Sequence, residues 1–148
     1  MTYLELAVDI KANAQAVWNG ITDWPAQGEW MLGTRVWTVK GDAHEVGGRL
    51  EAFTGIGKLG FLDTMEITVW KPPTRCEVVH TGKVVRGTGI FEVRETGENT
   101  SRFIWSEVLE LPWGIVGRIG FVFVRPFFIA GVRHSLNRFA RKVEKAHS

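Results

Sequence analysis

Glu107 interrupts a stretch that is otherwise apolar on one side. Along residues 101–111, alternation places it on the same side as Trp105 and other large apolar side chains. A carboxyl group desolvated on such a face has a raised pKa, which suits a general acid or base. Two structural alternatives stay open: Glu107 forms an ion pair with Arg118 or Arg125, or it lies in water at the edge of the molecule.

His80 is the second candidate, because alternation along residues 75–81 places it on one side with Cys76 and Val78. Histidine changes charge near neutral pH, so His80 could protonate or orient a ligand carbonyl. The alternative is a hydrogen-bonded structural histidine. Asp63 follows a glycine-rich stretch, where we expect it to be solvated. The catalytic candidates are therefore Glu107 and His80, without a complete catalytic set.

Other chemistries lack a matching pattern. Residues 55–60, GIGKLG, spell the dinucleotide motif G-x-G-x-x-G, but the next residues have strand rather than helix character, so no helix N-terminus would hold a pyrophosphate. We interpret this stretch as a hairpin loop in which Ile56, Leu59 and Phe61 gate a cavity. The four histidines and Cys76 have no metal-ligand spacing, and no G-x-S-x-G elbow occurs. We expect no cofactor and no metal.

The elements that carry these residues follow from hydrophobic periodicity. A first strand covers 4–10, and two short helices follow it, the first capped by Asn13. From Gly33 to Leu111 the period is two, and turn residues divide the chain. The predicted strands are 34–39, 48–54, 62–71, 75–81, 84–95 and 101–111. Short connections between consecutive strands predict an antiparallel meander.

The last third of the chain predicts one long helix. Apolar residues from Ile129 to Val143 recur at spacings of three and four, which places them on one helical stripe. Pro126 removes a helical hydrogen bond, so we expect a kink near residues 122–126 or a split into two helices. The sheet needs cover on one face, and this helix is long enough to provide it. The expected fold class is α+β.

Composition and charge narrow the function classes. The chain has 148 residues, of which 45% are hydrophobic, as expected for one globular domain. The start has no secretory signal pattern and the single cysteine allows no internal disulfide, so we expect a cytoplasmic protein. Residues 112–148 carry +6 and residues 1–111 carry −4. This charge lies on a helix rather than in an aromatic-lined basic groove, so nucleic-acid binding is not expected.

The pattern as a whole resembles the START-like helix-grip superfamily, which includes polyketide cyclases and aromatases, lipid-transfer domains and plant pathogenesis-related ligand binders. The resemblance covers nearly the whole chain. It rests on VWNGITDWPAQGEW (17–30), VGGRLEAF (46–53), VWKPPTRCEV (69–78), GTGIFEV (87–93), SRFIWSEVLEL (101–111) and SLNRFARKVE (135–144). The stretch LPWGIVGRIGFVFVRPFFIAG looks like a variant found in small bacterial members of the polyketide cyclase/dehydrase group.

The resemblance implies a single START-like domain over 1–148. A seven-stranded antiparallel sheet would wrap around the C-terminal helix and enclose a hydrophobic cavity, with two short helices between strands 1 and 2. Alternation along the strands adds the expected lining, with Gly87 and Gly89 leaving space. The expected ligand-binding residues are Met65, Ile67, Val78, His80, Gly89, Phe91, Trp105, Glu107, Arg118, Val122 and Arg125.

Three functions are compatible with this pattern. The first is binding or transport of a hydrophobic small molecule, such as a lipid or a polyketide, without catalysis. Its basic C-terminal helix would approach an anionic membrane peripherally. The second is a cyclase/dehydratase-type enzyme that uses Glu107 or His80 for proton transfer. The third is a partner-binding domain with a filled interior. The apolar run from Trp113 to Ile129 carries two arginines and three glycines, so we do not expect it to cross a bilayer.

Overall fold

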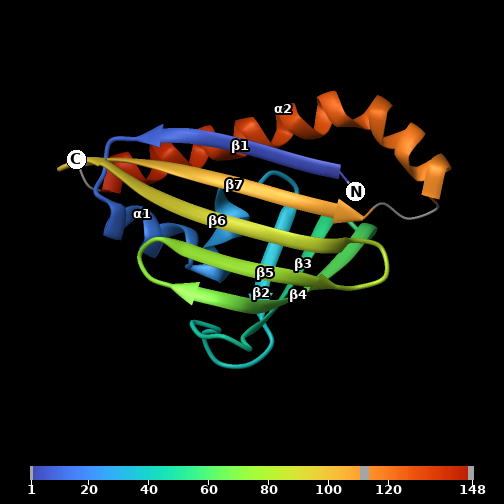
Figure 1. The fold of residues 1–148 in the computed structure, drawn as a ribbon, viewed down its shortest axis with the longest axis horizontal. Coiled ribbons are helices and arrows are strands. Elements are labelled where there is room, and N and C mark those ends of the chain that lie inside the picture. The colour runs from blue at the N-terminus through green and yellow to red at the C-terminus, as the bar shows by residue number, and fades with distance from the viewer. Residues whose placement is uncertain (1, 111–113, 147–148) are drawn as a thin grey trace.

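The computed structural model describes residues 2–110 and 114–146 of the chain. A seven-stranded antiparallel sheet curls beside one long helix (Figure 1). The strands are β1 (Thr2–Ile10), β2 (Thr34–Thr38), β3 (Arg49–Ile56), β4 (Leu59–Lys71), β5 (Arg75–Thr81), β6 (Arg86–Gly97) and β7 (Thr100–Glu110). The helices are α1 (Ala14–Ile21), the 3-10 helix η1 (Trp24–Glu29) and α2 (Gly114–Ala146). The predicted α+β helix-grip fold is confirmed.

Strands β2 to β7 form the predicted meander, and β1 pairs with the free edge of β7, giving the order β1-β7-β6-β5-β4-β3-β2. The GIGKLG stretch is a tight hairpin, because Ile56 pairs with Leu59 and only Gly57 and Lys58 lie between β3 and β4. Gly57 has a φ of 61°, a conformation that glycine adopts without steric cost. The predicted strand end at Leu111 lies outside the described residues.

The two short helices lie between β1 and β2, as predicted. The Asn13 side chain accepts a hydrogen bond of 2.8 Å from the backbone N–H of Ala16, which satisfies one of the free donors at the start of α1. Val17 and Ile21 point from α1 into the core and are fully buried. The second helix is the 3-10 helix η1, which begins at Trp24 with Pro25 in its first turn.

A β-bulge in β4 changes which side chains face the core. Alternation predicts that Val69 faces inward with Ile67, but the pairing with β5 shifts register between these two residues. After the extra residue, the side chains that alternation places on the outer face point to the core instead. Trp70 therefore packs against the core, with its ring centroid 5.1 Å from that of Trp18. The predicted inward position of Val69 is therefore wrong, and Trp70 is less exposed than the alternation implies.

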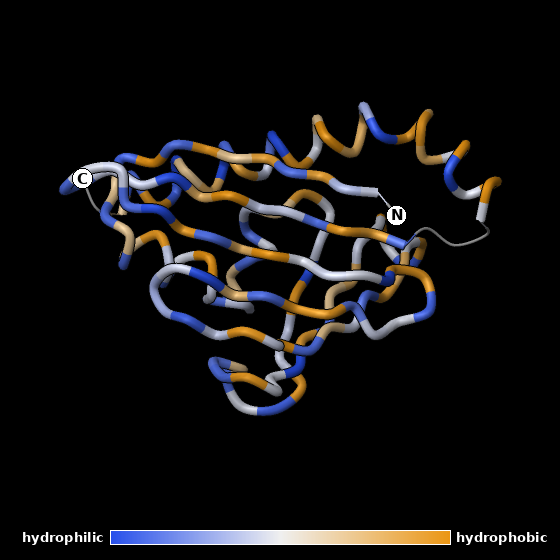
Figure 2. The backbone as a smooth tube through the Cα atoms, in the orientation of Figure 1, coloured by the Kyte–Doolittle hydropathy of each residue, from blue (hydrophilic) through white to orange (hydrophobic). Residues whose placement is uncertain are grey.

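Helix α2 is one continuous helix with Pro126 inside it, so the alternative of two helices is wrong. Its axis bends in the first half, which extends past the sheet (Figure 1). The helix contacts β1 and α1, and its buried side chains all lie in the second half. Its buried side chains are Ser135, Leu136, Phe139, Ala140 and Val143. The first half is exposed to solvent, and Figure 2 shows that it carries many hydrophobic residues.

Candidate functional site

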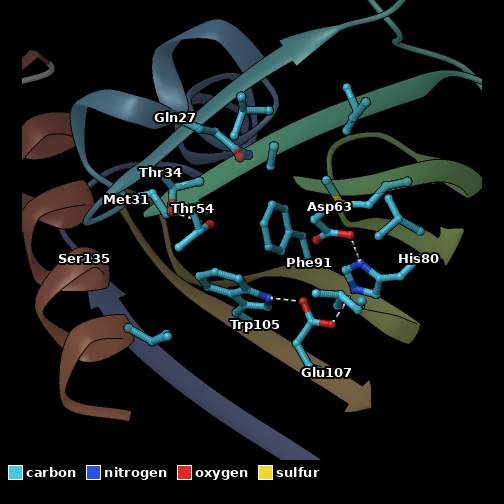
Figure 3. Close-up of a pocket in the computed structure, with 18 of the residues that line it drawn as sticks. Gln27, Met31, Thr34, Thr54, Asp63, His80, Phe91, Trp105, Glu107 and Ser135 are labelled. Carbon is cyan, nitrogen blue, oxygen red and sulfur yellow. Dashed lines mark hydrogen bonds and ion pairs between the residues drawn. The ribbon is translucent and has the colours of Figure 1, made fainter. Parts of the chain in front are cut away.

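A cavity of about 320 Å³ lies between the curled sheet, η1 and α2. This volume is near the lower end of the range for small-molecule sites. Figure 3 shows Ser135 of α2 on one side of the cavity and His80 on the opposite side. The strand residues that line it include Asp63, Met65, Cys76, Val78, His80, Gly89, Phe91, Trp105, Glu107 and Leu109, and Val85 of the β5–β6 connection lines it as well. The other elements contribute Trp24, Gln27, Met31, Leu32, Phe127, Phe128, Gly131, Val132 and Ser135. Most of this lining is apolar.

Three ionisable side chains meet on one wall of the cavity, and we call them the carboxylate–histidine cluster: Asp63, His80 and Glu107. His80 Nδ1 lies 2.9 Å from Asp63 Oδ1, and His80 Nε2 lies 2.9 Å from Glu107 Oε2 (Figure 3). The indole N–H of Trp105 donates to the second oxygen of Glu107 over 2.9 Å. Each side chain of the cluster is at least 86% buried, since the exposed fractions are 4% for His80 and 14% for both carboxylates.

The strand register explains how His80 and Glu107 meet. They come from β5 and β7, which are two strand spacings apart, about 9.5 Å. Strand β6 lies between them, and its residues there are Gly87, opposite His80, and Gly89, opposite Glu107. A Cβ at Gly89 would lie 2.9 Å from Glu107 Oε1, so only glycine leaves room for the carboxylate in this position. The imidazole and the carboxylate therefore bridge across β6.

Gly87 is glycine for a different reason. Its φ is 117°, and a Cβ there would lie only 1.9 Å from the backbone carbonyl oxygen of Val108 on β7. The prediction that Gly87 and Gly89 leave space is thus refined. Gly89 leaves space for a side chain of the cluster, whereas Gly87 allows the two backbones to approach each other.

The cluster fixes the protonation state of the imidazole. Burial lowers the pKa of His80, but the hydrogen bonds to Asp63 and Glu107, together with their negative charges, outweigh it and raise this pKa to about 10. At neutral pH His80 is therefore an imidazolium that donates both ring N–H groups. With two carboxylates and one imidazolium, the cluster has a formal charge of −1. Burial also raises the pKa of the Cys76 thiol, to about 12, so this lining residue stays neutral.

Hydrogen-bonding capacity toward a ligand is concentrated on Asp63. Among the described residues its second oxygen, Oδ2, accepts no hydrogen bond, and no lysine or arginine lines the cavity. Two other polar lining groups donate hydrogen bonds within the protein: the side-chain amide of Gln27 donates to the carbonyl of Ile21, and the hydroxyl of Ser135 donates to that of Gly131. The cavity is therefore apolar with one acceptor-rich, net negative wall.

Seven of the eleven residues expected to bind a ligand line this cavity, namely Met65, Val78, His80, Gly89, Phe91, Trp105 and Glu107. Ile67 is 1% exposed and packs in the core without lining it. Arg118, Val122 and Arg125 do not line it either, because they lie on the exposed first half of α2. The proposed ion pair of Glu107 with either arginine is wrong, since Glu107 contacts His80 and Trp105.

The expectation that Asp63 is solvated is also wrong. Met65 pairs directly with His80, so Asp63 is one diagonal step away on the same face. The position of Asp63 on the same face of the sheet as His80 could have identified it as a residue of the cluster. In contrast, no periodic pattern in the sequence predicts which residues of η1 and α2 line the cavity, because this depends on where the two helices pack on the sheet.

Comparison with solved structures finds the same fold in several proteins. A protein from Thermus thermophilus superposes with a TM-score of 0.78 at 18% identity, over 99% of this chain and 100% of that one. The Zhui aromatase/cyclase from Streptomyces sp. R1128 has a TM-score of 0.76 at 12% identity, over 99% and 96% of the two chains. A START superfamily protein from Mycobacterium smegmatis has a TM-score of 0.76 at 12% identity, over 97% and 98%.

At these identities the similarity shows the shared fold alone. No curated protein matches the sequence at a significant level. The family model described as polyketide cyclase/dehydrase and lipid transport matches residues 1–144, which is almost the whole chain. The START-like resemblance of the sequence is confirmed by this match and by the superpositions, and the chain belongs to the polyketide cyclase/dehydrase and lipid transport family.

Proposed function

We propose that this protein binds a hydrophobic small molecule, a lipid or a polyketide-like compound, that carries a hydrogen-bond donor. The observation that carries the proposal is the carboxylate–histidine cluster in an otherwise apolar cavity. Apolar burial supplies affinity, roughly 25 cal/mol per Å² of apolar surface removed from water. The free oxygen of Asp63 accepts a hydrogen bond from a hydroxyl or amine of the ligand, and the negative charge of Glu107 adds electrostatic attraction.

The same wall disfavours an anionic ligand. A carboxylate or phosphate entering the cavity would meet a cluster with a charge of −1, and no described lysine or arginine lines the cavity to offset it. Arg118 and Arg125, which the sequence analysis expected among the ligand-binding residues, do not line the cavity. Specificity for a donor therefore comes from both attraction to the carboxylates and repulsion of competing anions.

Two measurements test this function. Native mass spectrometry, followed by organic extraction, identifies any molecule that copurifies, and a compound with a hydroxyl or amine at near-unit occupancy is expected. Calorimetric titration then compares n-octylamine and n-octanol with octanoate, which share one chain length. We expect octanoate to bind at least tenfold more weakly than the amine. Equal or tighter binding of octanoate, in a protein that folds normally, would contradict the proposal.

Substitutions in the cluster separate its contribution to ligand preference from the contribution of apolar burial. Asp63→Asn and Glu107→Gln keep the side-chain size but remove negative charge, so we expect the preference for amine over octanoate to fall at least fivefold. Glu110→Gln is the matched control, because Glu110 lies on the same strand but is exposed and does not line the cavity. An unchanged preference for amine over octanoate in both cluster variants would mean that other residues determine which polar group the protein binds.

A cyclase/dehydratase-type enzyme is the second candidate. Two carboxylates and an imidazolium in an apolar cavity can move protons on a folded substrate, and the relative from Streptomyces sp. R1128 is named an aromatase/cyclase. With a pKa near 10, His80 would serve as a proton donor, and the free oxygen of Asp63 would be the base.

The enzyme hypothesis predicts that substitutions in the cluster lower turnover and leave substrate affinity similar. With a poly-β-keto thioester as substrate and chromatography of the cyclised product, Glu107→Gln or His80→Ala should lower turnover at least tenfold with similar affinity. If the parent protein shows no turnover above the uncatalysed rate while it binds the substrate, the binding function stands and the enzyme hypothesis fails.

A further inference from the structure

The first half of α2, residues 114–128, is apolar and uncovered, and we call it the projecting half-helix. Val116, Phe123 and Phe127 are 73%, 74% and 80% exposed. Helical geometry places these three on one side, since steps of seven and four residues return to nearly the same direction. Arg118 and Arg125, also seven residues apart, lie on a different side of the helix. Figure 2 shows this half extending beyond the sheet.

Two further exposed apolar groups lie at the same end of the cavity. At the β3–β4 hairpin, Ile56 and Leu59 are 87% and 84% exposed and flank Lys58. In the β5–β6 connection, Val84 is 47% exposed. Phe61, Val85 and Phe127, one from each of these two segments and the projecting half-helix, line the same cavity, so all three segments border one site. We call residues 56–62, 82–86 and 114–128 the rim.

The rim is basic as well as apolar. It contains Lys58, Lys83, Arg86, Arg118 and Arg125 and no aspartate or glutamate. Exposed apolar patches of this kind mark an interaction surface, and the uniform positive charge selects a negatively charged partner. We propose that the rim docks on an anionic lipid bilayer, with the apolar face of the projecting half-helix in the interface and the cavity opening toward the lipid. This inference goes beyond ligand binding and does not depend on it.

The projecting half-helix lies on the bilayer rather than across it. Helix α2 has the length and composition expected of a membrane span, and its most apolar stretch is not buried in the domain. However, both ends of this stretch belong to one domain. Glu110 ends β7 only four residues before Gly114, and the second half of α2 packs on β1 and α1. Four residue steps extend over at most about 14 Å, which is less than half of the hydrocarbon core.

Vesicle flotation tests the docking surface. We expect the protein to bind vesicles of phosphatidylcholine with 30% phosphatidylglycerol, and the partition coefficient to fall at least tenfold on vesicles of phosphatidylcholine alone or in high salt. The double variant Val116→Ser/Phe123→Ser removes apolar contacts, and Arg118→Gln/Arg125→Gln removes charge. Each should lower binding to anionic vesicles at least tenfold. Arg141→Gln, on the packed half of the same helix, is the matched control and should change binding less than threefold.

The variants leave the cavity intact, since none of the four substituted residues lines it. Octylamine affinity in solution should therefore be unchanged, which separates failure of membrane docking from failure of the proposed ligand binding. The proposal is overturned if the parent protein does not float with anionic vesicles, or if the rim variants bind them as well as the control. A concentration-dependent dimer in analytical ultracentrifugation, lost in Val116→Ser/Phe123→Ser without any vesicle binding, would instead assign this surface to a second copy of the chain.

Discussion

At the residue scale, the decisive feature is a buried histidine held between two carboxylates. Each ring nitrogen of His80 is 2.9 Å from a carboxylate oxygen, so the imidazole keeps both protons and its orientation is fixed from two sides. Trp105 fixes Glu107 in turn. The ligand wall is therefore preorganised, and one absent side chain, that of Gly89, makes the arrangement possible.

Gly89→Ala tests this steric requirement. The added methyl would meet the carboxylate at 2.9 Å, and because that group ends a flexible side chain, it can move aside without displacing the backbone. We expect the protein to fold normally while Glu107 moves from His80, so that the pKa of His80 falls below that of the parent. Titration of the imidazole resonances by NMR measures this pKa.

Gly131→Ala is the matched control for this substitution. It adds the same methyl to the opposite wall, where the nearest atom is Leu32 Cδ2 at 3.8 Å, an ordinary contact. The pKa of His80 should not change in this variant. If it changed equally in both variants, the shift would reflect altered cavity volume rather than displacement of Glu107.

At the element scale, α2 consists of two halves with different surroundings. In the second half Phe139 is 1% exposed, with its ring 4.8 Å from Trp30 and 5.6 Å from Phe103. In the first half Phe123 is 74% exposed. The anchoring of the helix therefore comes from its C-terminal turns, and the projecting half-helix contributes little to folding in solution.

Matched phenylalanine substitutions measure this difference. Phe139→Ala should lower the free energy of unfolding by about 3–5 kcal/mol, because it leaves a cavity among buried rings. Phe123→Ala should change it by less than about 0.5 kcal/mol, as for other exposed positions. Urea unfolding followed by far-UV circular dichroism gives both values. A comparable loss in the two variants would show that the first half of α2 also packs on the domain.

At the scale of the whole molecule, the cluster links stability to pH. His80 holds its proton up to a pH of about 10 in the folded protein. In the unfolded chain it releases that proton near its ordinary pKa of about 6.5. The contribution of this proton to the free energy of unfolding is therefore complete below a pH of about 6.5 and is lost as the pH rises toward 10. The free energy of unfolding then falls by at most about 1.4 kcal/mol per pH unit for one proton.

Unfolding free energies between pH 6 and pH 10 test this linkage. Relative to the parent protein, Glu107→Gln should show a shallower decline, because one of the two partners that raise the pKa of His80 loses its charge. His134→Asn, at an exposed position of α2, is the control and should follow the parent curve. Parallel curves for all three proteins would mean that Glu107 does not raise the pKa of His80.

The sequence by itself determined the fold class, the strand order along the chain and most of the cavity-facing strand residues. Alternation is a local property, and it holds wherever a strand is regular, as for Val78, His80, Phe91 and Trp105. It failed at the bulge in β4, where one extra residue exchanged Val69 for Trp70. It identified Glu107 and His80 as unusual, but it could not pair them.

Only the tertiary structure decided which groups meet. The contacts of His80 with Asp63 and Glu107 join three strands across a glycine-containing fourth, and such a bridge depends on inter-strand register, which no single segment encodes. The path of α2 is likewise set by packing at its C-terminal half. Its apolar first half therefore lies exposed beside the cavity, and Arg118, Val122 and Arg125 lie outside it, because a helix follows the contacts that anchor it rather than the hydrophobicity of its free end.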